Sequence, residues 1–154
     1  MYDVAVIGCG IVGAAAAYEL SRYNCRVLVL EAKNDVANVT TKANSAILHA
    51  GYDPTPGTLM AETNVRGVAL AKELCEKLDV EREEIGSLVL AFGEEDERHL
   101  EKLYQQGLAN GVPGIELLTA DEVHALEPNV SDKVTAALYA PTAAIVSPWE
   151  YALA

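Results

Sequence analysis

The first part of the chain alternates short apolar runs with one helix-like segment. Residues 4–8 form an apolar run that ends in glycine, which is typical of a strand buried on both faces of a parallel sheet. Residues 11–23 predict a helix, because alanines favour helix and apolar positions share one face. Residues 26–31 form a second apolar run, which ends on an acidic residue. Strand, helix and strand in this order predict a βαβ unit.

Beyond this unit, the pattern predicts a polar loop followed by further helices and strands. Thr119 and Glu122 have the spacing of a capping box, which opens a short helix. A last helix is expected to begin at Ser147, since proline follows at the first helical position. The remaining expected elements are a loop over 34–45, an apolar stretch over 46–50, a helix over 58–78, a strand over 86–92, an acidic helix over 94–109 that is stopped by Asn110 and Gly111, and a strand over 134–140.

The composition is that of a globular protein. The chain has 154 residues, of which 51% are hydrophobic and 22% are charged, with 11 glycines and 6 prolines. These values exclude disordered and collagen-like classes. No apolar run reaches the roughly 18 residues that a transmembrane helix requires, so we expect none.

The charge is strongly negative and unevenly distributed. The net charge is -12, and residues 73–101 alone hold eleven acidic and three basic side chains. Nucleic acids and anionic membrane surfaces are therefore poor partners. Residues 1–50 hold four side chains of each sign and can accept an anionic ligand.

The cysteines and histidines predict neither a disulfide framework nor a metal site. Cys9, Cys25 and Cys75 are odd in number and widely spaced, which favours a reducing compartment. His99 and His124 have no Cys or His at metal-binding spacing. We therefore expect a cytoplasmic protein without a metal, and we leave open a peripheral association of the intact protein with a membrane.

The strongest chemical signal is a GxGxxG motif at Gly8, Gly10 and Gly13, directly after the first strand. In such a turn the first glycine allows the tight bend, the second lets a pyrophosphate approach the backbone, and the third lets the helix pack on the strand. Glu31 ends the second strand, where a carboxylate can accept ribose hydroxyls. These residues predict a dinucleotide site and leave open whether it holds FAD or NAD. A plain glycine-rich turn is the alternative.

Two stretches carry a family resemblance. Residues 3–13 together with Glu31 resemble the N-terminal FAD-binding motif of the D-amino-acid-oxidase-like flavoprotein superfamily. Residues 41–53, followed by 56–59, resemble a narrower branch that contains FAD-dependent glycerol-3-phosphate dehydrogenases and L-2-hydroxyglutarate oxidases. Later segments, among them 140–148, are also similar to that branch, so the resemblance covers the whole chain.

The resemblance implies a set of FAD-binding residues. The ADP half of FAD would lie on the glycine loop and Glu31, and the flavin would lie near residues 41–51. The implied residues are Gly8, Gly10, Ile11, Val12, Gly13, Glu31, Ala32, Lys33, Thr41, Asn44, Ser45, His49 and Gly51. For His49 we keep three interpretations, namely a non-covalent neighbour of the flavin, a covalent attachment point, and a histidine satisfied within the core.

The implied function is that of an FAD-dependent oxidoreductase acting on a small anionic hydroxy compound. Glycerol 3-phosphate, oxidised to dihydroxyacetone phosphate by hydride transfer to the flavin, is the first choice. L-2-hydroxyglutarate, or an amine or amino acid, is the alternative substrate within the superfamily. An NAD-dependent dehydrogenase domain and an inactive nucleotide-binding fragment are the alternatives outside it. The sequence identifies neither a general base nor the electron acceptor, and it leaves self-association open.

The expected fold class is α/β, with a Rossmann-like FAD-binding core and the start of an α+β substrate domain. The resemblance places the first FAD-binding segment at 1–80, the start of the substrate domain at 81–145, and a return to the FAD-binding domain at 146–154. Proteins of this branch are much longer, so we expect the chain to be truncated and, on its own, to bind FAD weakly and catalyse little.

Overall fold

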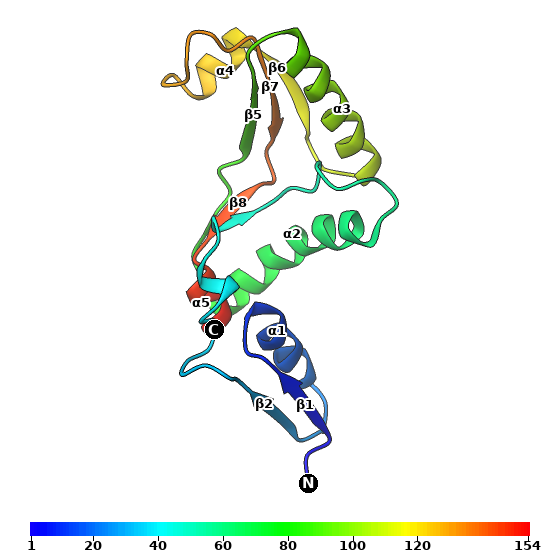
Figure 1. Cartoon of the computed structure of the whole chain (residues 1–154), viewed down its shortest axis with the longest axis vertical. Coiled ribbons are helices and arrows are strands. Elements are labelled where there is room, and N and C mark those ends of the chain that lie inside the picture. The colour runs from blue at the N-terminus through cyan, green and yellow to red at the C-terminus, as the bar shows by residue number, and fades with distance from the viewer. The chain divides into compact units, whose positions relative to one another are not determined.

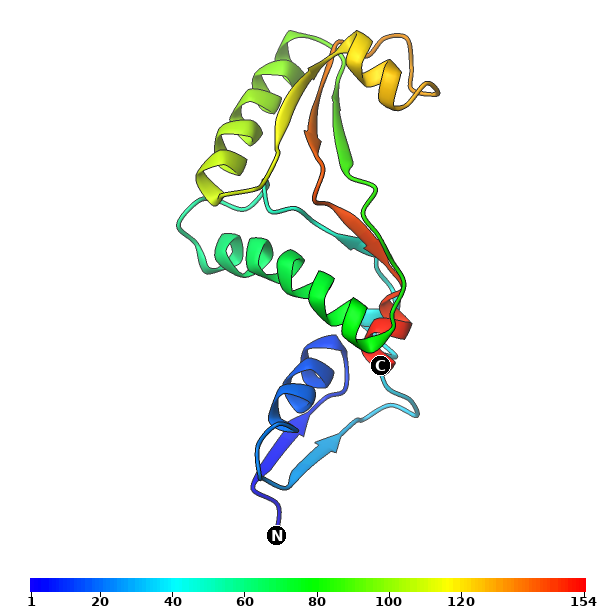
Figure 2. The same ribbon diagram turned by 180° about the vertical axis from the view of Figure 1, so that it is seen from behind.

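A computed structural model describes all residues, 1–154. The chain contains five α-helices, eight strands and one short 3-10 turn. Figures 1 and 2 show most of these elements from two sides. None of its helices combines the length and the apolar character needed to cross a membrane. In chain order the elements are β1 (Val4–Ile7), α1 (Ile11–Leu20), β2 (Val27–Leu30), η1 (Thr40–Lys42), β3 (Ile47–Leu48), α2 (Leu59–Leu78), β4 (Arg82–Glu83), β5 (Ser87–Ala91), α3 (Glu94–Asn110), β6 (Glu116–Thr119), α4 (Ala120–Leu126), β7 (Ala136–Ala140), β8 (Ala144–Val146) and α5 (Pro148–Leu153).

The chain divides into two compact units, each made of several segments. Unit 1 comprises Met1–Ile47, Leu74–Arg82 and Val146–Ala154, and unit 2 comprises Leu48–Glu73 and Glu83–Ile145. The chain passes from one unit to the other at four places, within β3, α2, β4 and β8. The division into an FAD-binding domain over 1–80 and 146–154 and a substrate domain over 81–145 stays a prediction.

Unit 1 contains the predicted βαβ arrangement. Strands β1 and β2 pair in parallel, with Val4 opposite Val27 and Ile7 opposite Leu30, and α1 connects them. Helix α1 ends at Leu20, three positions before the predicted end. The Ser21 hydroxyl donates to the Tyr18 carbonyl at 2.6 Å, and such a local side-chain bond competes with continuation of the helix.

The strands of unit 1 are less buried than the sequence predicts. Ile7 is 86% exposed and Leu30 is 49% exposed, so the expectation of strands buried on both faces is wrong for this chain. The physical reason is that only one face of this sheet is covered: Val4 and Val6 are partly buried, with Val6 beside Gly13 of α1, whereas Ala5 and Ile7 point to the opposite face and are exposed.

Unit 2 contains the better-packed sheet, an antiparallel one of order β5-β7-β6. Alternate residues of its central strand β7 belong to different clusters: Leu138 packs with Leu100 and Leu103 of α3, whereas Ala137 packs with Val123 of α4. Because successive side chains of a strand point to opposite faces, α3 and α4 cover opposite faces of this sheet. Leu138 and Ala137 are both fully buried, so the core of unit 2 lies around β7.

Local end signals predict the helices of this chain well. Helix α2 extends over almost the predicted range, and α3 ends where Gly111 adopts a left-handed conformation. The capping box of α4 is present, and Ser147 accepts the Glu150 N–H at the start of α5. Strands β4, β6 and β8 are missing from the sequence prediction, because segments this short carry no clear alternation of polar and apolar residues.

Candidate functional site

The glycine loop between β1 and α1 has the tight geometry that its motif predicts. Gly8 has φ of 94°, a left-handed value that favours glycine, and its N–H donates to the Leu30 carbonyl at 2.7 Å. A Cβ on Gly13 would lie 2.0 Å from the Gly8 carbonyl oxygen. No side chain fits there, so Gly13 allows α1 to begin directly against the end of β1.

Gly10 and Thr41 together shape the N-terminus of α1. The Ile11 N–H donates to the Thr41 hydroxyl oxygen at 3.1 Å, and a Cβ on Gly10 would lie 3.1 Å from that oxygen. The first amides of a helix have no partner within it, and they carry about half a positive charge. The N–H groups of Val12 and Gly13 belong to this first turn. The turn can therefore bind an anion, to which the Thr41 hydroxyl can also donate its proton.

Glu31 is tied to the same loop through its carboxylate. One oxygen accepts the Cys9 N–H at 2.7 Å and the other accepts the Lys33 N–H at 2.8 Å. These two bonds, Cys9 first, lower the pKa of Glu31 below its ordinary value, so the side chain is ionised at neutral pH. A carboxylate has about four acceptor positions, so Glu31 can still accept hydroxyl groups from a ligand.

These features border a groove of about 560 Å³ in unit 1. Of the predicted residues, the groove brings together those of the glycine loop and two from the following loop, while Glu31, Ala32, Lys33 and Ser45 lie outside its lining. The lining residues are Val6, Ile7, Gly8, Gly10, Ile11, Val12, Gly13, Ala16, Thr40, Thr41 and Asn44.

Asn44 has a structural role besides its place in this lining. Its amide nitrogen donates to the Thr41 carbonyl at 2.7 Å, and its amide oxygen accepts the Ala46 N–H at 2.7 Å. Asn44 therefore fixes the turn that presents Thr41 to the helix terminus.

His49 and Gly51 lie in unit 2, on the loop that leads to α2. They border a second pocket of about 410 Å³, together with Tyr52, Asp53, Pro54, Met60, Thr63 and Asn64. His49 is exposed, so the interpretation as a core histidine does not hold, because its side chain is not buried in this chain. Gly51 is buried with φ of 106°, and a Cβ there would lie 2.6 Å from Val65 Cγ2. Gly51 is thus required for the approach of the loop to α2.

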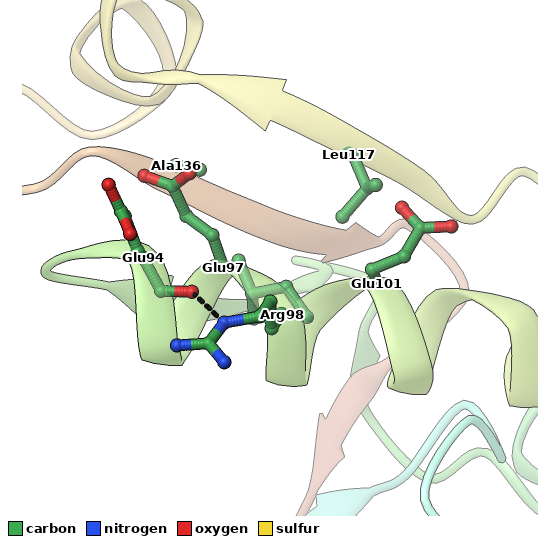
Figure 3. A pocket seen from close by; sticks show the side chains of 7 residues that line it. Glu94, Glu97, Arg98, Glu101, Leu117 and Ala136 are labelled. Carbon is green, nitrogen blue, oxygen red and sulfur yellow. Dashed lines mark hydrogen bonds between the residues drawn. The ribbon is translucent and has the colours of Figure 1, made fainter.

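A third pocket, of about 490 Å³, lies between α3 and the sheet of unit 2 (Figure 3). Leu100, Leu117 and Ala136 form its apolar part, and three carboxylates border it, from Glu94, Glu97 and Glu101. Its one cationic residue, Arg98, donates to the Glu94 carbonyl at 3.1 Å. This border is negative overall and therefore disfavours an anionic substrate. No group of three or more His, Cys, Asp or Glu side chains in the structure is placed to hold a metal ion.

The comparison with known families decides the assignment. The family described as FAD dependent oxidoreductase matches residues 3–154 of this chain. The chain belongs to the FAD-dependent oxidoreductase family. FAD is accordingly the cofactor of this family. The sequence motif alone left FAD and NAD open, and the family match selects FAD.

Individual relatives in this FAD-dependent family are similar over most of the chain. A glycerol 3-phosphate dehydrogenase of Caloramator mitchellensis is 51% identical over 154 residues, which are 100% of this chain and 32% of the relative. A mitochondrial L-2-hydroxyglutarate dehydrogenase of Dictyostelium discoideum is 34% identical over 149 residues, or 95% of this chain and 33% of the relative. The chain thus spans about a third of the length of these relatives.

A solved structure has the same fold. The L-alpha-glycerophosphate oxidase of Mycoplasma pneumoniae, with FAD bound, matches with a TM-score of 0.90 and 33% identity. The match covers 99% of this chain and 40% of the oxidase. The expected fold class, a Rossmann-like FAD-binding core with the start of an α+β domain, is confirmed.

The glycine loop of this family member fits the ADP half of FAD. The anion-binding turn at Gly10–Gly13 suits a pyrophosphate, and the ionised Glu31, which bonds to the Cys9 N–H of the same loop, suits ribose hydroxyls. A Cβ on Gly10 would project beside Thr41 at the mouth of this turn. The residues present therefore fit the cofactor of the family.

Three residues that hold the loop beside the second pocket are absent from the site residues that the sequence predicts. Asn64, Gln106 and Asn110 donate side-chain amide bonds to the loop that carries His49 and Gly51. Asn110 is recognisable from the sequence only as a helix end before glycine. Gln106 has no local signal, because its partners lie more than fifty positions away.

Proposed function

We propose that the protein containing this chain binds FAD on the glycine loop and oxidises glycerol 3-phosphate to dihydroxyacetone phosphate. The observation that carries the proposal is the 51% identity, over the whole chain, to a glycerol 3-phosphate dehydrogenase. The geometry of the glycine loop supports the cofactor part independently. The substrate would be a small anion, as the relatives' names indicate.

Each predicted site residue then has a physical role. Val12 and Gly13 would donate backbone N–H groups to the pyrophosphate, Thr41 would donate its hydroxyl, and Glu31 would accept ribose hydroxyls. Ala32 and Lys33 would flank the adenosine, while the loop with His49 and Gly51 would lie beside the flavin ring. When bound, FAD would supply the hydride acceptor for oxidation of the alcohol to a ketone. The chain's own residues bind and orient the reactants.

The proposal also covers the roles of the two domains and the cellular compartment. Residues 1–80 and 146–154 would belong to the FAD-binding domain, and residues 81–145 would begin the substrate domain. The thiols of Cys9, Cys25 and Cys75 are all unpaired, which supports a reducing compartment such as the cytoplasm.

L-2-hydroxyglutarate is the second candidate substrate, because an L-2-hydroxyglutarate dehydrogenase is 34% identical over 95% of the chain. Anaerobic reduction of the bound flavin separates the candidates. We expect glycerol 3-phosphate to bleach the flavin absorbance within seconds, and L-2-hydroxyglutarate, glycine and proline to leave it unchanged. Bleaching by L-2-hydroxyglutarate alone would overturn the substrate assignment. Absence of bleaching by every compound would indicate a nucleotide-binding protein without turnover.

A further inference from the structure

The loop over residues 49–54 is held by side-chain amides rather than by regular secondary structure. Asn64 Nδ2, on α2, donates to the His49 carbonyl at 3.0 Å. The other donors come from α3 and are Gln106 and Asn110. Gln106 Nε2 donates to the carbonyls of Tyr52 at 3.4 Å and Asp53 at 3.2 Å, and Asn110 Nδ2 donates to those of Gly51 at 2.9 Å and Pro54 at 2.7 Å.

The spacing of Gln106 and Asn110 explains how one helix reaches the whole loop. Residues four apart lie on the same helix face, so both amides project toward the loop. Figures 1 and 2 show this loop passing the C-terminal end of α3 on its way to α2. Four consecutive carbonyls, from Gly51 to Pro54, thus receive donors from a helix that lies more than fifty positions away in the sequence.

Two glycines bring the loop close enough for these bonds. A Cβ on Gly107 of α3 would lie 2.3 Å from Ile115 Cδ1 and 3.1 Å from Tyr52 Cβ. On the other side, Gly51 lies against Val65 of α2 without room for a Cβ. The loop backbone is therefore clamped between α2 and α3.

The clamp matters because this loop forms one wall of the pocket that contains His49. Gly51, Tyr52, Asp53 and Pro54 all border that pocket, and all four of their carbonyls are bonded to α3. Any shift of the two amides would displace this wall directly.

We propose that Gln106 and Asn110 are positioning residues, which hold loop 49–54 in the one conformation that presents its pocket wall to the flavin and substrate. This inference rests on the proposed function, since it takes the loop to lie beside the flavin. It adds that a helix of the predicted substrate domain, through two amides, sets the conformation of the flavin-side loop.

The test compares Asn110→Asp and Gln106→Glu with the matched control Gln105→Glu. The first two replace an N–H donor with a carboxylate oxygen that faces carbonyl oxygens, which are then unpaired and repelled. Gln105 lies on the same helix, is exposed, and donates only to Glu101 at 2.9 Å, so its variant makes the same charge change away from the loop. Asn110→Ala is a milder variant in case the aspartate variant does not fold.

The first readout is hydrogen exchange of residues 49–57 without FAD. We expect exchange in this segment to be about tenfold faster in the Asn110 and Gln106 variants and unchanged in the control. The second readout is the rate at which saturating glycerol 3-phosphate reduces the bound flavin, at a temperature where all variants are folded. We expect that rate to fall about tenfold in the same variants, because the loop no longer orients the reactants.

Each outcome separates the two proposals. A wild-type protein that takes up no FAD overturns the proposed function. If the flavin is reduced at the same rate in the wild type, Asn110→Asp and Gln106→Glu, the positioning role alone is overturned. Faster hydrogen exchange of the loop together with an unchanged reduction rate would mean that the two amides only stabilise the structure. Unchanged exchange in both variants also overturns it.

Discussion

At the scale of single residues, two glycines within helices differ in the space available for a side chain. A Cβ on Gly13 would collide with the Gly8 carbonyl, whereas a Cβ on Gly67, in the middle of α2, would meet nothing within 4 Å. The same substitution should therefore have opposite effects at the two sites.

We expect Gly13→Ala to lower the free energy of unfolding by about 1–3 kcal/mol, because α1 must move away from β1. Gly67→Ala should raise it by about 0.5–1 kcal/mol, because alanine has the better helix propensity and an unfolded chain with fewer conformations. Urea unfolding of both variants measures the difference. A loss of stability at Gly67 as large as that at Gly13 would contradict the packing described here.

Glu31 gives the chain a pH-dependent contribution to stability. Its folded-state pKa is lowered by the N–H bonds from Cys9 and Lys33, so its contribution is present above the ordinary pKa of 4.5 and is lost as the pH falls through the lower folded value. We expect the stability of Glu31→Gln to depend less on pH than that of the wild type below about pH 5. Urea unfolding at a series of pH values tests this, and parallel curves for the two proteins would contradict it.

At the scale of elements, the ends of helices are fixed by local chemistry. Thr119 and Glu122 bond reciprocally at the start of α4: the Thr119 hydroxyl oxygen accepts the Glu122 N–H at 3.5 Å, and the Glu122 carboxylate accepts the Thr119 N–H at 2.8 Å and the Thr119 hydroxyl at 2.7 Å. Because both partners lie within four positions, the sequence alone predicts this cap.

Loss of this cap has a defined cost. We expect Thr119→Ala to lower the free energy of unfolding by about 1 kcal/mol, and Thr119→Ser, which keeps the hydroxyl, to lower it by much less. Thermal or urea unfolding of the two variants distinguishes them. Equal losses would show that the methyl group, and not the hydroxyl, stabilises this helix start.

The sequence predicts local features of this chain better than distant contacts. The glycine loop, Glu31 and the helix caps follow from residues near one another in the chain. Strand β6 does not follow, because it is too short to show a clear pattern. The amide bonds of Gln106 and Asn110 do not follow either, because their partners in the loop over 49–54 lie more than fifty positions away. The burial of β1 and β2 also depends on which elements cover each face of their sheet, and the local pattern does not reveal that.

At the scale of the whole molecule, the two units differ in how well they are packed. Strand β7 is hydrogen-bonded on both edges and carries the fully buried Leu138, whereas β1 and β2 pair along one edge only and have exposed side chains. We expect the amides of β7 to exchange with solvent at least about tenfold more slowly than those of β1 and β2 in the chain without FAD. Equal protection of β1 and β7 would contradict this difference between the units.

The central claim is that the glycine loop of unit 1 binds FAD, and Gly10 tests it most directly. Gly10 has an extended backbone with φ of -78° that any residue can adopt, and an added Cβ would lie 3.1 Å from the Thr41 hydroxyl oxygen. That distance is tighter than an ordinary contact, so we expect Gly10→Ala to fold with the Thr41 side chain shifted by a few tenths of an ångström. The same Cβ would stand where the pyrophosphate approaches the backbone. The decisive measurement is the FAD dissociation constant of Gly10→Ala in the protein that contains this chain, with Gly67→Ala as the control. We predict that the dissociation constant rises at least about tenfold in Gly10→Ala and stays unchanged in Gly67→Ala. Equal FAD affinity of Gly10→Ala and the wild type would contradict the account.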